Sequence, residues 1–327
     1  MKLKKLHIKN FKSLVNLEID EPNTFTVFVG ANGVGKSNIF EALEFNAASI
    51  ASPGLYQRLF GSKEDLLSKN ASDSTIEVAL TLDTIGTYIT SYDFSESPIW
   101  GRELGRDHDF NNPEHNNINN FWLRAFSRIF IGNRKEVKFL IKDNLNLALD
   151  GSNLEKVLKR LLQDERKREE MVEYLQLFIP EFENIEVYTD NVGGTDTLLF
   201  YEKGTSRPYG KNLISNGSYN ILCLLTAVLQ SDSPQFLCIE EPENGLTPYA
   251  IEAFVEFFRN KCEERGHYIW LNTHSQTLVR QLREEELILV DKQEGATRVK
   301  QLKKGDFFGL KADEAWLTNA LDAGLPW

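Results

Sequence analysis

Hydrophobic and polar residues in the first part of the chain follow patterns that predict strands and then a helix. Residues 3–9 alternate between the two classes and indicate an edge strand. Thr24–Val29 is an apolar run that predicts a second strand leading into a glycine-rich turn. Ser37–Ser49, rich in Ala, Leu, Phe and Glu, predicts a helix. Two alternating runs within residues 76–92 predict a hairpin whose loop is Asp83–Gly86.

The middle of the chain changes character twice. From about residue 95 to 120 the sequence is rich in Asn, Asp, His, Gly and Pro, which predicts a long polar loop. Residues 118–180 then place apolar side chains at helical spacing and predict a helical insertion that ends at Pro180. Two apolar stripes support this prediction: Leu154, Val157, Leu158, Leu161 and Leu162, and then Met171, Val172, Leu175 and Phe178.

Strands and helices alternate in the last part of the chain, which predicts a mostly parallel, helix-covered sheet. Two strands come first, and after them a buried helix leads into a strand of four apolar residues and an acid, Phe236–Glu240. The expected elements are strands at 185–188 and 197–201, a helix at 220–229, the strand 236–240, a helix at 248–265, a strand at 267–272, a helix from 276, a strand at 287–291 and a closing helix that contains Trp316, Leu317 and Leu321.

Composition indicates a globular protein with a sizeable core. Of the 327 residues, 41% are hydrophobic and 26% are charged, as in ordinary globular domains. No apolar run reaches the roughly 18 residues that span a bilayer, and the charged N-terminus lacks the apolar core of a signal peptide. Cys223, Cys238 and Cys262 match no metal-binding spacing, so we expect buried thiols, a cytoplasmic location and no membrane contact.

Charge narrows the choice of partners. The net charge of −11 argues against a protein that coats nucleic acid by bulk electrostatics, although it leaves a local basic groove open. The basic run Arg166–Arg168 lies among acidic residues. We interpret it as a solvated helical face, with a nucleic-acid contact as the alternative.

The stretch Gly30–Ser37 carries the first chemical signal. It fits the phosphate-binding pattern G-x-x-x-x-G-K-[ST] and lies between a predicted strand and a predicted helix, as that pattern requires. Its glycines allow backbone N–H groups to face phosphate oxygens, and the following helix points its positive end there. Lys36 would reach the β and γ phosphates of ATP, and the Ser37 hydroxyl would bind Mg²⁺.

Two adjacent carboxylates carry the second signal. Glu240 and Glu241 end a strand that the sequence predicts to be buried, and Pro242 and Gly245 then break the chain. Buried carboxylates are costly unless something uses them, and a metal ion with an attacking water would do so. We expect Glu240 to hold Mg²⁺ through its water shell and Glu241 to polarise the water.

Two further segments lie where a nucleotide site would need them. Ser215 and Gly217 precede the predicted helix before the acidic strand, although an ordinary helix cap explains such a Ser equally well. His274 follows the next apolar strand, where it is placed to touch a γ-phosphate.

The order of these motifs resembles the ABC-type ATPases, and more narrowly their RecF, SMC and OLD branch. Four motifs follow one another in the order seen in that family: the phosphate loop, Ser215–Ser218, the acidic strand with the residues Glu240–Leu246 at its end, and Thr273–Ser275. The segment Ile8–Leu14 is similar to the N-terminal strand and turn of the family. The resemblance implies a P-loop NTPase with an α/β ABC-ATPase head: a mixed sheet, an antiparallel β lobe and a helical insertion. It divides the chain into residues 1–94 (phosphate loop and β lobe), 95–184 (polar loop and helical insertion) and 185–327 (signature, acidic strand and switch His).

The resemblance assigns a role to each matching residue. Asn10 and Lys12 would lie near the adenine or ribose, Ser215 and Gly217 would contact ATP held by a second subunit, and the loop 244–247 would meet its twin across the dimer. Glu241 would be the catalytic base, His274 the switch residue and Lys36 a phosphate ligand. The phosphate-binding residues would be Gly30, Ala31, Asn32, Gly33, Val34, Gly35, Lys36, Ser37 and Asn38, with Ser37 and Glu240 serving Mg²⁺.

Some positions depart from the family pattern. The metal-side acid is Glu240 rather than the more common Asp, and the segment beginning Ile214-Ser-Asn-Gly differs from the Leu-Ser-Gly-Gly-Gln of transporter ATPases. Gln57 is the candidate for the glutamine loop, with an ordinary surface residue as the alternative. The stretch after Asp291 is short for the Toprim nuclease domain of OLD proteins.

These motifs predict an ATP- and Mg²⁺-dependent ATPase that acts as an ATP-gated homodimer with composite sites, with a higher oligomer left open. The resemblance implies a role in DNA-linked processes or in bacterial anti-phage defence beside a separate effector protein. One alternative is an ATP-sensing scaffold that holds an effector with negligible hydrolysis. Another is a DNA repair ATPase that contacts nucleic acid.

Overall fold

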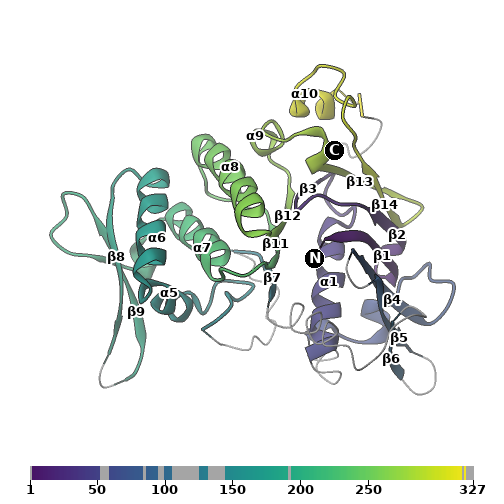
Figure 1. Ribbon diagram of the computed structural model, residues 1–327, viewed down its shortest axis with the longest axis horizontal. Coiled ribbons are helices and arrows are strands. Elements are labelled where there is room, and N and C mark those ends of the chain that lie inside the picture. The colour runs from purple at the N-terminus through teal and green to yellow at the C-terminus, as the bar shows by residue number, and fades with distance from the viewer. Residues whose placement is uncertain are drawn as a thin grey trace. The chain divides into compact units, whose positions relative to one another are not determined.

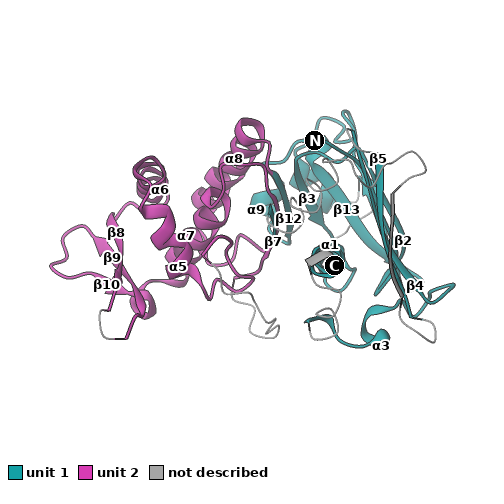
Figure 2. Ribbon diagram, turned by 60° about the horizontal axis from the view of Figure 1, so that its bottom comes forward, with its two compact units in different colours: residues 1–126, 268–327 teal, residues 127–267 magenta. Residues whose placement is uncertain are grey.

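The computed structural model describes residues 2–51, 59–83, 86–94, 99–104, 125–131, 144–190, 193–318 and 320–321. The chain divides into two compact units, which Figure 2 shows in different colours. Unit 1 holds residues 1–126 and 268–327, and unit 2 holds residues 127–267. The expected division into residues 1–94, 95–184 and 185–327 stays a prediction.

Unit 1 contains an antiparallel sheet of five strands, the β lobe, in the order β2-β1-β4-β5-β6 (Figure 1). Its strands are β1 (Leu3–Phe11), β2 (Leu14–Asp20), β4 (Thr75–Leu82), β5 (Gly86–Asp93) and β6 (Ile99–Leu104). The predicted hairpin at 76–92 is confirmed as β4 and β5. Two expectations were wrong. The first strand is not at an edge, because β2 pairs with its other side, and β6 lies within the predicted polar loop.

The second sheet of unit 1 is built on parallel strands. β3 (Phe25–Val29) pairs in parallel with β12 (Tyr268–Thr273) on one side and with β13 (Leu287–Gln293) on the other, and β14 (Ala296–Gln301) returns antiparallel to β13. Every residue of β3 and β12 is buried. The mostly parallel sheet predicted from the alternation of strands and helices is therefore confirmed.

Helix α1 (Lys36–Ala51) packs between the two sheets of unit 1. Phe40 meets Phe28 of β3 with ring centroids 5.5 Å apart, and Phe45 meets Phe11 of β1 at 5.6 Å. Aromatic side chains on two faces of one helix thus join both sheets in a single core. Short helices complete the unit: α3 (Lys63–Leu66), α9 (Gln276–Val279), the 3₁₀ turn η2 (Glu284–Glu286) and α10 (Ala312–Leu317).

Unit 2 is mainly helical. It contains α5 (Leu154–Leu162), α6 (Glu165–Phe178), α7 (Asn216–Leu229) and α8 (Pro248–Arg265), and Pro248 occupies the first turn of α8, where proline is tolerated. Phe178 of α6 stacks on Phe254 of α8 at 4.0 Å between ring centroids. The predicted stripe of α5 is buried except for Leu162.

The strands of unit 2 form two groups. β8 (Phe182–Thr189), β9 (Asp196–Glu202) and β10 (Tyr209–Gly210) make an antiparallel sheet that ends in the 3₁₀ turn η1 (Lys211–Leu213). β11 (Phe236–Glu240), fully buried as predicted, lies beside β7 (Phe126–Ile129). The expectation of helix throughout 118–180 was wrong at β7, which pairs with β11, and at residues 144–153, which form turns and bends before α5.

Burial agrees with the expectation for the cysteines: Cys223, Cys238 and Cys262 are buried and form no disulfide. Removal from water raises the pKa of Cys223 to about 12. In the part of the chain that the structure describes, no helix combines the length and apolar character needed to cross a bilayer.

Candidate functional site

The predicted phosphate-binding loop connects β3 to α1 in unit 1. β3 ends at Val29, and α1 begins at Lys36. The first N–H groups of a helix have no partner within the helix, and its positive end favours anions. The strand–loop–helix arrangement that the motif requires is therefore present, and its middle residues, Asn32 and Gly33, are exposed.

Lys36 lies inside the curve of this loop. Its side chain is buried, and its Nζ donates to the carbonyl oxygens of Gly30 at 2.7 Å and Ala31 at 2.8 Å. A buried ammonium group held by carbonyl oxygens is an unusual arrangement for a lysine. It places a positive charge at the position where a phosphate-binding loop receives anionic oxygens.

The end of β12 brings two more residues to the loop. Thr273 pairs with Val29 in the parallel register, so His274 leaves its strand at the same edge of the sheet as Gly30. Asn272, buried in β12, donates its Nδ2 to the Ser37 hydroxyl at 3.4 Å. The structure therefore brings together the phosphate loop, Ser37 and the predicted switch residue His274 within unit 1, while sequence reasoning missed Asn272.

Asn10 lies near the end of β1 and Lys12 in the turn between β1 and β2, and both have positive φ (60° and 50°). Asn10 is fully buried, and its amide donates to Asp73 Oδ1 and the Thr75 carbonyl, each at 2.9 Å. Lys12 pairs with Glu41 of α1. Both side chains order the β lobe here, and their place near the adenine or ribose stays a prediction.

Glu240 closes β11 in unit 2, and it has a partner that the sequence did not reveal. Arg128 of β7 donates its Nε to Glu240 Oε1 at 2.6 Å, and its Nη2 contacts the same oxygen. Both side chains are 1% exposed. The cost of burying each charge is offset by the other, so Arg128 holds the Glu240 side chain at the end of this strand.

Glu241 adopts a strained backbone conformation directly after the strand. Its φ is +46°, a region that costs a non-glycine residue roughly 1–2 kcal/mol. Its half-buried carboxylate accepts from Asn244 Nδ2 at 3.1 Å. Strain that the surrounding structure maintains is concentrated at functional positions, and here it falls on the residue predicted to act on water.

The loop after Glu241 is fastened to α7. Asn220 donates its Nδ2 to the carbonyl oxygens of Pro242 at 3.1 Å and Asn244 at 2.8 Å. Sequence reasoning missed this role, although a polar residue at the start of the buried run 220–229 was its signal.

Ser215 and Gly217 begin α7. Ser215 is exposed and caps the helix by accepting from Ser218 N at 3.0 Å. A Cβ on Gly217 would lie 2.3 Å from the Gly245 carbonyl, so only glycine permits this approach of helix and loop. Ser215, Gly217 and the loop 242–245 thus form one surface of unit 2.

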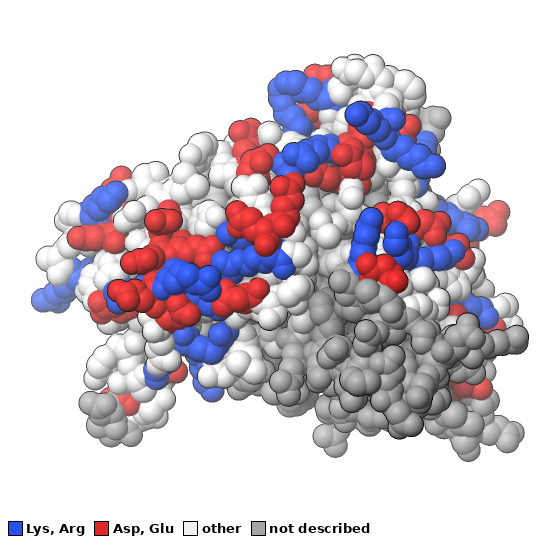
Figure 3. Space-filling view, in the orientation of Figure 1, with Lys and Arg blue, Asp and Glu red and all other residues white. Residues whose placement is uncertain are grey.

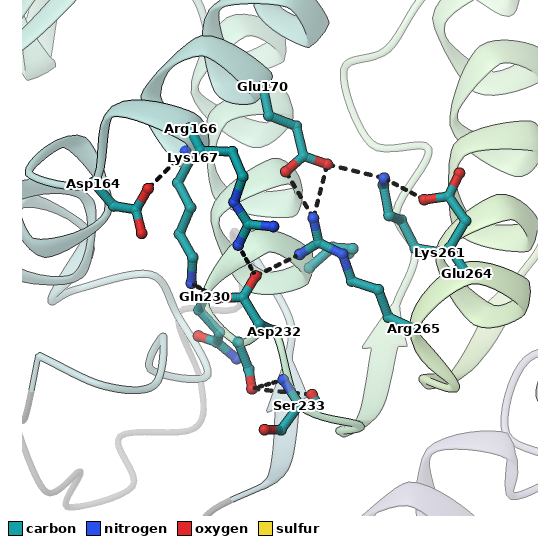
Figure 4. A network of polar contacts seen from close by, with 12 residues as sticks. Asp164, Arg166, Lys167, Glu170, Gln230, Asp232, Ser233, Lys261, Glu264 and Arg265 are labelled. Carbon is teal, nitrogen blue, oxygen red and sulfur yellow. Dashed lines mark hydrogen bonds and ion pairs between the residues drawn. The ribbon is translucent and has the colours of Figure 1, made fainter.

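Arg166 and Lys167 of the basic run belong to an ion-pair network (Figure 4), whereas Arg168 is exposed, and Figure 3 shows basic and acidic side chains mixed on this side of the molecule. Arg166, Lys167 and Arg265 meet Asp232, and Lys261 and Arg265 meet Glu170. Burial alone would raise the pKa of Glu170, but its pairs with Lys261 and Arg265 outweigh it and hold that pKa below its ordinary value. The predicted solvated face holds for exposed Arg166 but is wrong for Lys167, which is buried.

Two further expectations concern the glutamine loop and the metal site. Gln57 lies outside the described residues. Among the residues that are described, no group of three or more His, Cys, Asp or Glu could hold a metal ion by itself. The expected roles of Ser37 and Glu240 at a magnesium ion stay predictions.

A family profile matches the residues that carry this geometry. The family is described as "AAA domain, putative AbiEii toxin, Type IV TA system", and the match spans residues 25–280, from β3 to the residue after α9. The chain belongs to this family. Within it, the motifs and fold described above make the chain an ABC-type ATPase of the RecF/SMC branch.

Curated relatives match over short stretches. The chromosome partition protein Smc of Methanocaldococcus jannaschii is 54% identical over 43 residues, 13% of this chain and 4% of that protein. The DNA double-strand break repair Rad50 ATPase of Aeropyrum pernix is 36% identical over 78 residues, 24% of this chain and 8% of Rad50. The DNA replication and repair protein RecF of Lactococcus lactis subsp. cremoris is 43% identical over 47 residues, 14% of this chain and 13% of RecF.

Solved SMC heads share the fold of this family member. A head bound to the C-winged helix domain of ScpA aligns with 93% of this chain and 99% of that head, with a TM-score of 0.65 and 16% identity. The SMC head domain from Thermotoga maritima aligns with 93% of this chain and all of that domain, with a TM-score of 0.55 and 16% identity. The predicted P-loop fold with a mixed sheet and antiparallel sheets is thereby confirmed.

Proposed function

We propose that this chain binds ATP with Mg²⁺ and hydrolyses it as an ATP-gated dimer. The observation that carries the proposal is the buried Lys36 ammonium inside a strand–loop–helix phosphate site. Unit 1 supplies the phosphate loop, Ser37 and His274, and unit 2 supplies Glu240 and Glu241. A bound Mg²⁺ would neutralise the charge that develops on the phosphate oxygens.

The residues of the chain have separable roles in this proposal. Lys36 binds the β and γ phosphates, and the start of α1 receives them through backbone N–H groups. Glu241, held by Asn244, accepts a proton from the attacking water. Ser37 and Glu240 are oxygen donors of the kind Mg²⁺ prefers, so they fit a metal that shares its shell with water and phosphate. His274 contacts the γ-phosphate. We also carry forward the nucleotide contacts of Asn38 and, near the adenine or ribose, of Asn10 and Lys12.

A second subunit completes the site in this proposal. Ser215 and Gly217 would face ATP held by the partner, with the loop 244–247 close by. Two exposed apolar side chains flank this surface in unit 2, Leu213 at 74% and Tyr249 at 60% exposure.

The biological setting is proposed from the relatives alone. Rad50 and RecF are named for DNA repair, Smc for chromosome partition, and the family for a putative toxin of a toxin–antitoxin system. These names support a DNA-linked or defence role in the cytoplasm. An SMC head solved with a domain of ScpA supports a separate effector protein as partner. An ATP-sensing scaffold with negligible turnover is the second candidate.

Phosphate release and ATP binding by three proteins test the proposal. We expect the wild type to hydrolyse ATP, Lys36→Ala to lose binding, and Glu241→Gln to bind ATP with turnover lower by about 10²-fold or more, the range of general base catalysis. Removal of Mg²⁺ with a chelator should abolish turnover of the wild type. ATP binding without any single-turnover phosphate release by the wild type would instead support the scaffold.

A further inference from the structure

The hairpin of β13 and β14 contacts the phosphate loop through hydrogen bonds to its backbone. Thr297 of β14 is 1% exposed, and its hydroxyl donates to the Val34 carbonyl at 2.7 Å. Lys292 of β13 donates its Nζ to the Gly33 carbonyl at 3.4 Å. Two consecutive carbonyl groups of the loop are therefore held by a hairpin that follows more than 250 residues later in the chain.

The Thr297 hydroxyl belongs to a relay whose direction is fixed. Asn38 Nδ2 donates to the Ser13 hydroxyl at 2.7 Å, and the hydroxyls of Ser13 and Thr297 are 2.6 Å apart. A carbonyl oxygen only accepts, so Thr297 gives its single proton to Val34 and must accept from Ser13. Asn38 thus donates to Ser13, Ser13 donates to Thr297, and Thr297 donates to the Val34 carbonyl of the loop.

Gly35 shows how closely the two hydroxyls approach the loop. A Cβ at this position would lie 2.1 Å from the Thr297 hydroxyl oxygen and 2.6 Å from that of Ser13. The φ of Gly35 is +106°, so glycine is required here for its conformation as well as for space. A backbone hydrogen bond of 2.8 Å from Thr297 N to the Ser13 carbonyl fixes the two hydroxyls relative to each other.

We propose that Thr297 and Ser13 are positioning residues for the nucleotide phosphates. In a trans peptide the C=O and N–H groups point in opposite directions, so holding the Val34 carbonyl fixes the direction of the Gly35 N–H. Glycine places little restraint on its own backbone, and without the relay that peptide can rotate. The relay therefore aims a phosphate-binding N–H group before ATP arrives. This inference rests on the proposed ATP binding.

Thr297→Val tests the inference, because it keeps the shape of the side chain and removes the hydroxyl. We expect the Kd for ATP to rise about tenfold, the effect of losing one well-placed hydrogen bond. Thr297→Ser restores the hydroxyl and should bind within about twofold of the wild type. Ser13→Ala breaks the relay one step earlier and should weaken binding in the same direction. The double variant should bind no more weakly than the weaker single variant, because both changes interrupt one relay.

Thr226→Val is the matched control. Thr226 is a fully buried threonine of α7 whose hydroxyl also donates to a backbone carbonyl, that of Leu222 at 2.7 Å. It lies in unit 2, outside the relay, so its variant should change the unfolding midpoint without changing the Kd for ATP. Unchanged ATP affinity in both Thr297→Val and Ser13→Ala would overturn the inference, as would equal weakening by Thr226→Val. A wild type that bound no ATP would refute the proposed function itself, and the inference with it.

Discussion

Arg128 forms a buried ion pair with Glu240 that contributes to the stability of the fold. Both side chains are 1% exposed, and removal of one member of a buried pair costs about 3–5 kcal/mol because the other charge stays buried without compensation. We expect Arg128→Met to lower the free energy of unfolding by that amount, measured by urea denaturation without nucleotide. Glu240→Gln in the Arg128→Met background should recover a large part of the loss.

The same pair makes a prediction about metal. With Arg128 replaced by Met, Glu240 loses the positive charge of this guanidinium group, so a cation bound at Glu240 would compensate more of its charge than in the wild type. Mg²⁺ with ADP should therefore raise the unfolding midpoint of Arg128→Met more than that of the wild type. An equal rise in both proteins would show that Glu240 and the metal do not interact.

His267 gives the protein a specific sensitivity to acid. The residue is fully buried, and desolvation, with Arg265 as a smaller cause, lowers its pKa to about 4. In the unfolded chain its pKa is about 6.5, so below that pH the unfolded state binds a proton that the folded state refuses. Stability should fall by up to about 3 kcal/mol as the pH drops from 6.5 to 4.

His267→Gln isolates this contribution. The variant lacks the titrating ring, so its free energy of unfolding should change less between pH 6.5 and 4 than that of the wild type. Urea denaturation at three pH values in this window measures the difference. Parallel curves for the two proteins would assign the acid sensitivity to carboxylates such as Glu170, whose lowered pKa acts at the acidic end of the range.

The residues proposed to act on ATP are marked by motifs in the sequence, whereas the residues that contact them in the structure are not. Lys36, Ser37, Glu240 and Glu241 stand at fixed spacing beside glycine and proline, which a sequence displays. Arg128 lies in a four-residue strand without a motif, and it reaches Glu240 only through strand pairing. Such partners are set by tertiary contact, which local patterns do not encode.

At the scale of elements, the sequence analysis predicted several strands from a continuous or alternating pattern but missed others, among them β2, although its residues Val15–Asp20 alternate. Phe236–Glu240 was predicted with its bounds because four apolar residues end at a charge. β2 and β14 were missed. Their exposed positions carry charged and amide side chains, and in Ala296–Gln301 only Thr297 is buried. These strands form through pairing with β1 and β13 rather than through their own propensity.

The missed hairpin has a consequence for how the phosphate loop is supported. β13 was predicted, but its turn at Glu294 and Gly295, both with positive φ, returns the chain along the loop as β14. Asn70 of the β lobe donates to the Glu294 carbonyl at 2.9 Å. Asn70 therefore holds the turn while the strands of the hairpin hold the loop, so two sequence-distant segments of unit 1 support the phosphate loop.

At the scale of the whole molecule, chain order distributes the predicted catalytic groups over both units. Unit 1 carries Lys36 and His274, and unit 2 carries Ser215, Glu240 and Glu241. The matched stretches of Smc, Rad50 and RecF amount to 4%, 8% and 13% of those proteins, so this chain shares a small part of their length. What it shares with solved SMC heads is the fold of the head.

Complementation between two inactive variants tests whether one copy of the chain can complete a site. Lys36→Ala removes phosphate binding, and Ser215→Arg places a bulky cation on the exposed start of α7 that would face the partner's ATP. Each variant alone should be inactive. An equal mixture should regain about a quarter of wild-type turnover, because half of the dimers pair the two variants and each such dimer keeps one intact site. Full activity of Ser215→Arg alone would place the whole site within one chain, whereas no recovery on mixing well-folded variants would mean that subunits do not share sites. Glu241→Gln should form a dimer in ATP by light scattering, since ATP that is not hydrolysed keeps the two copies joined.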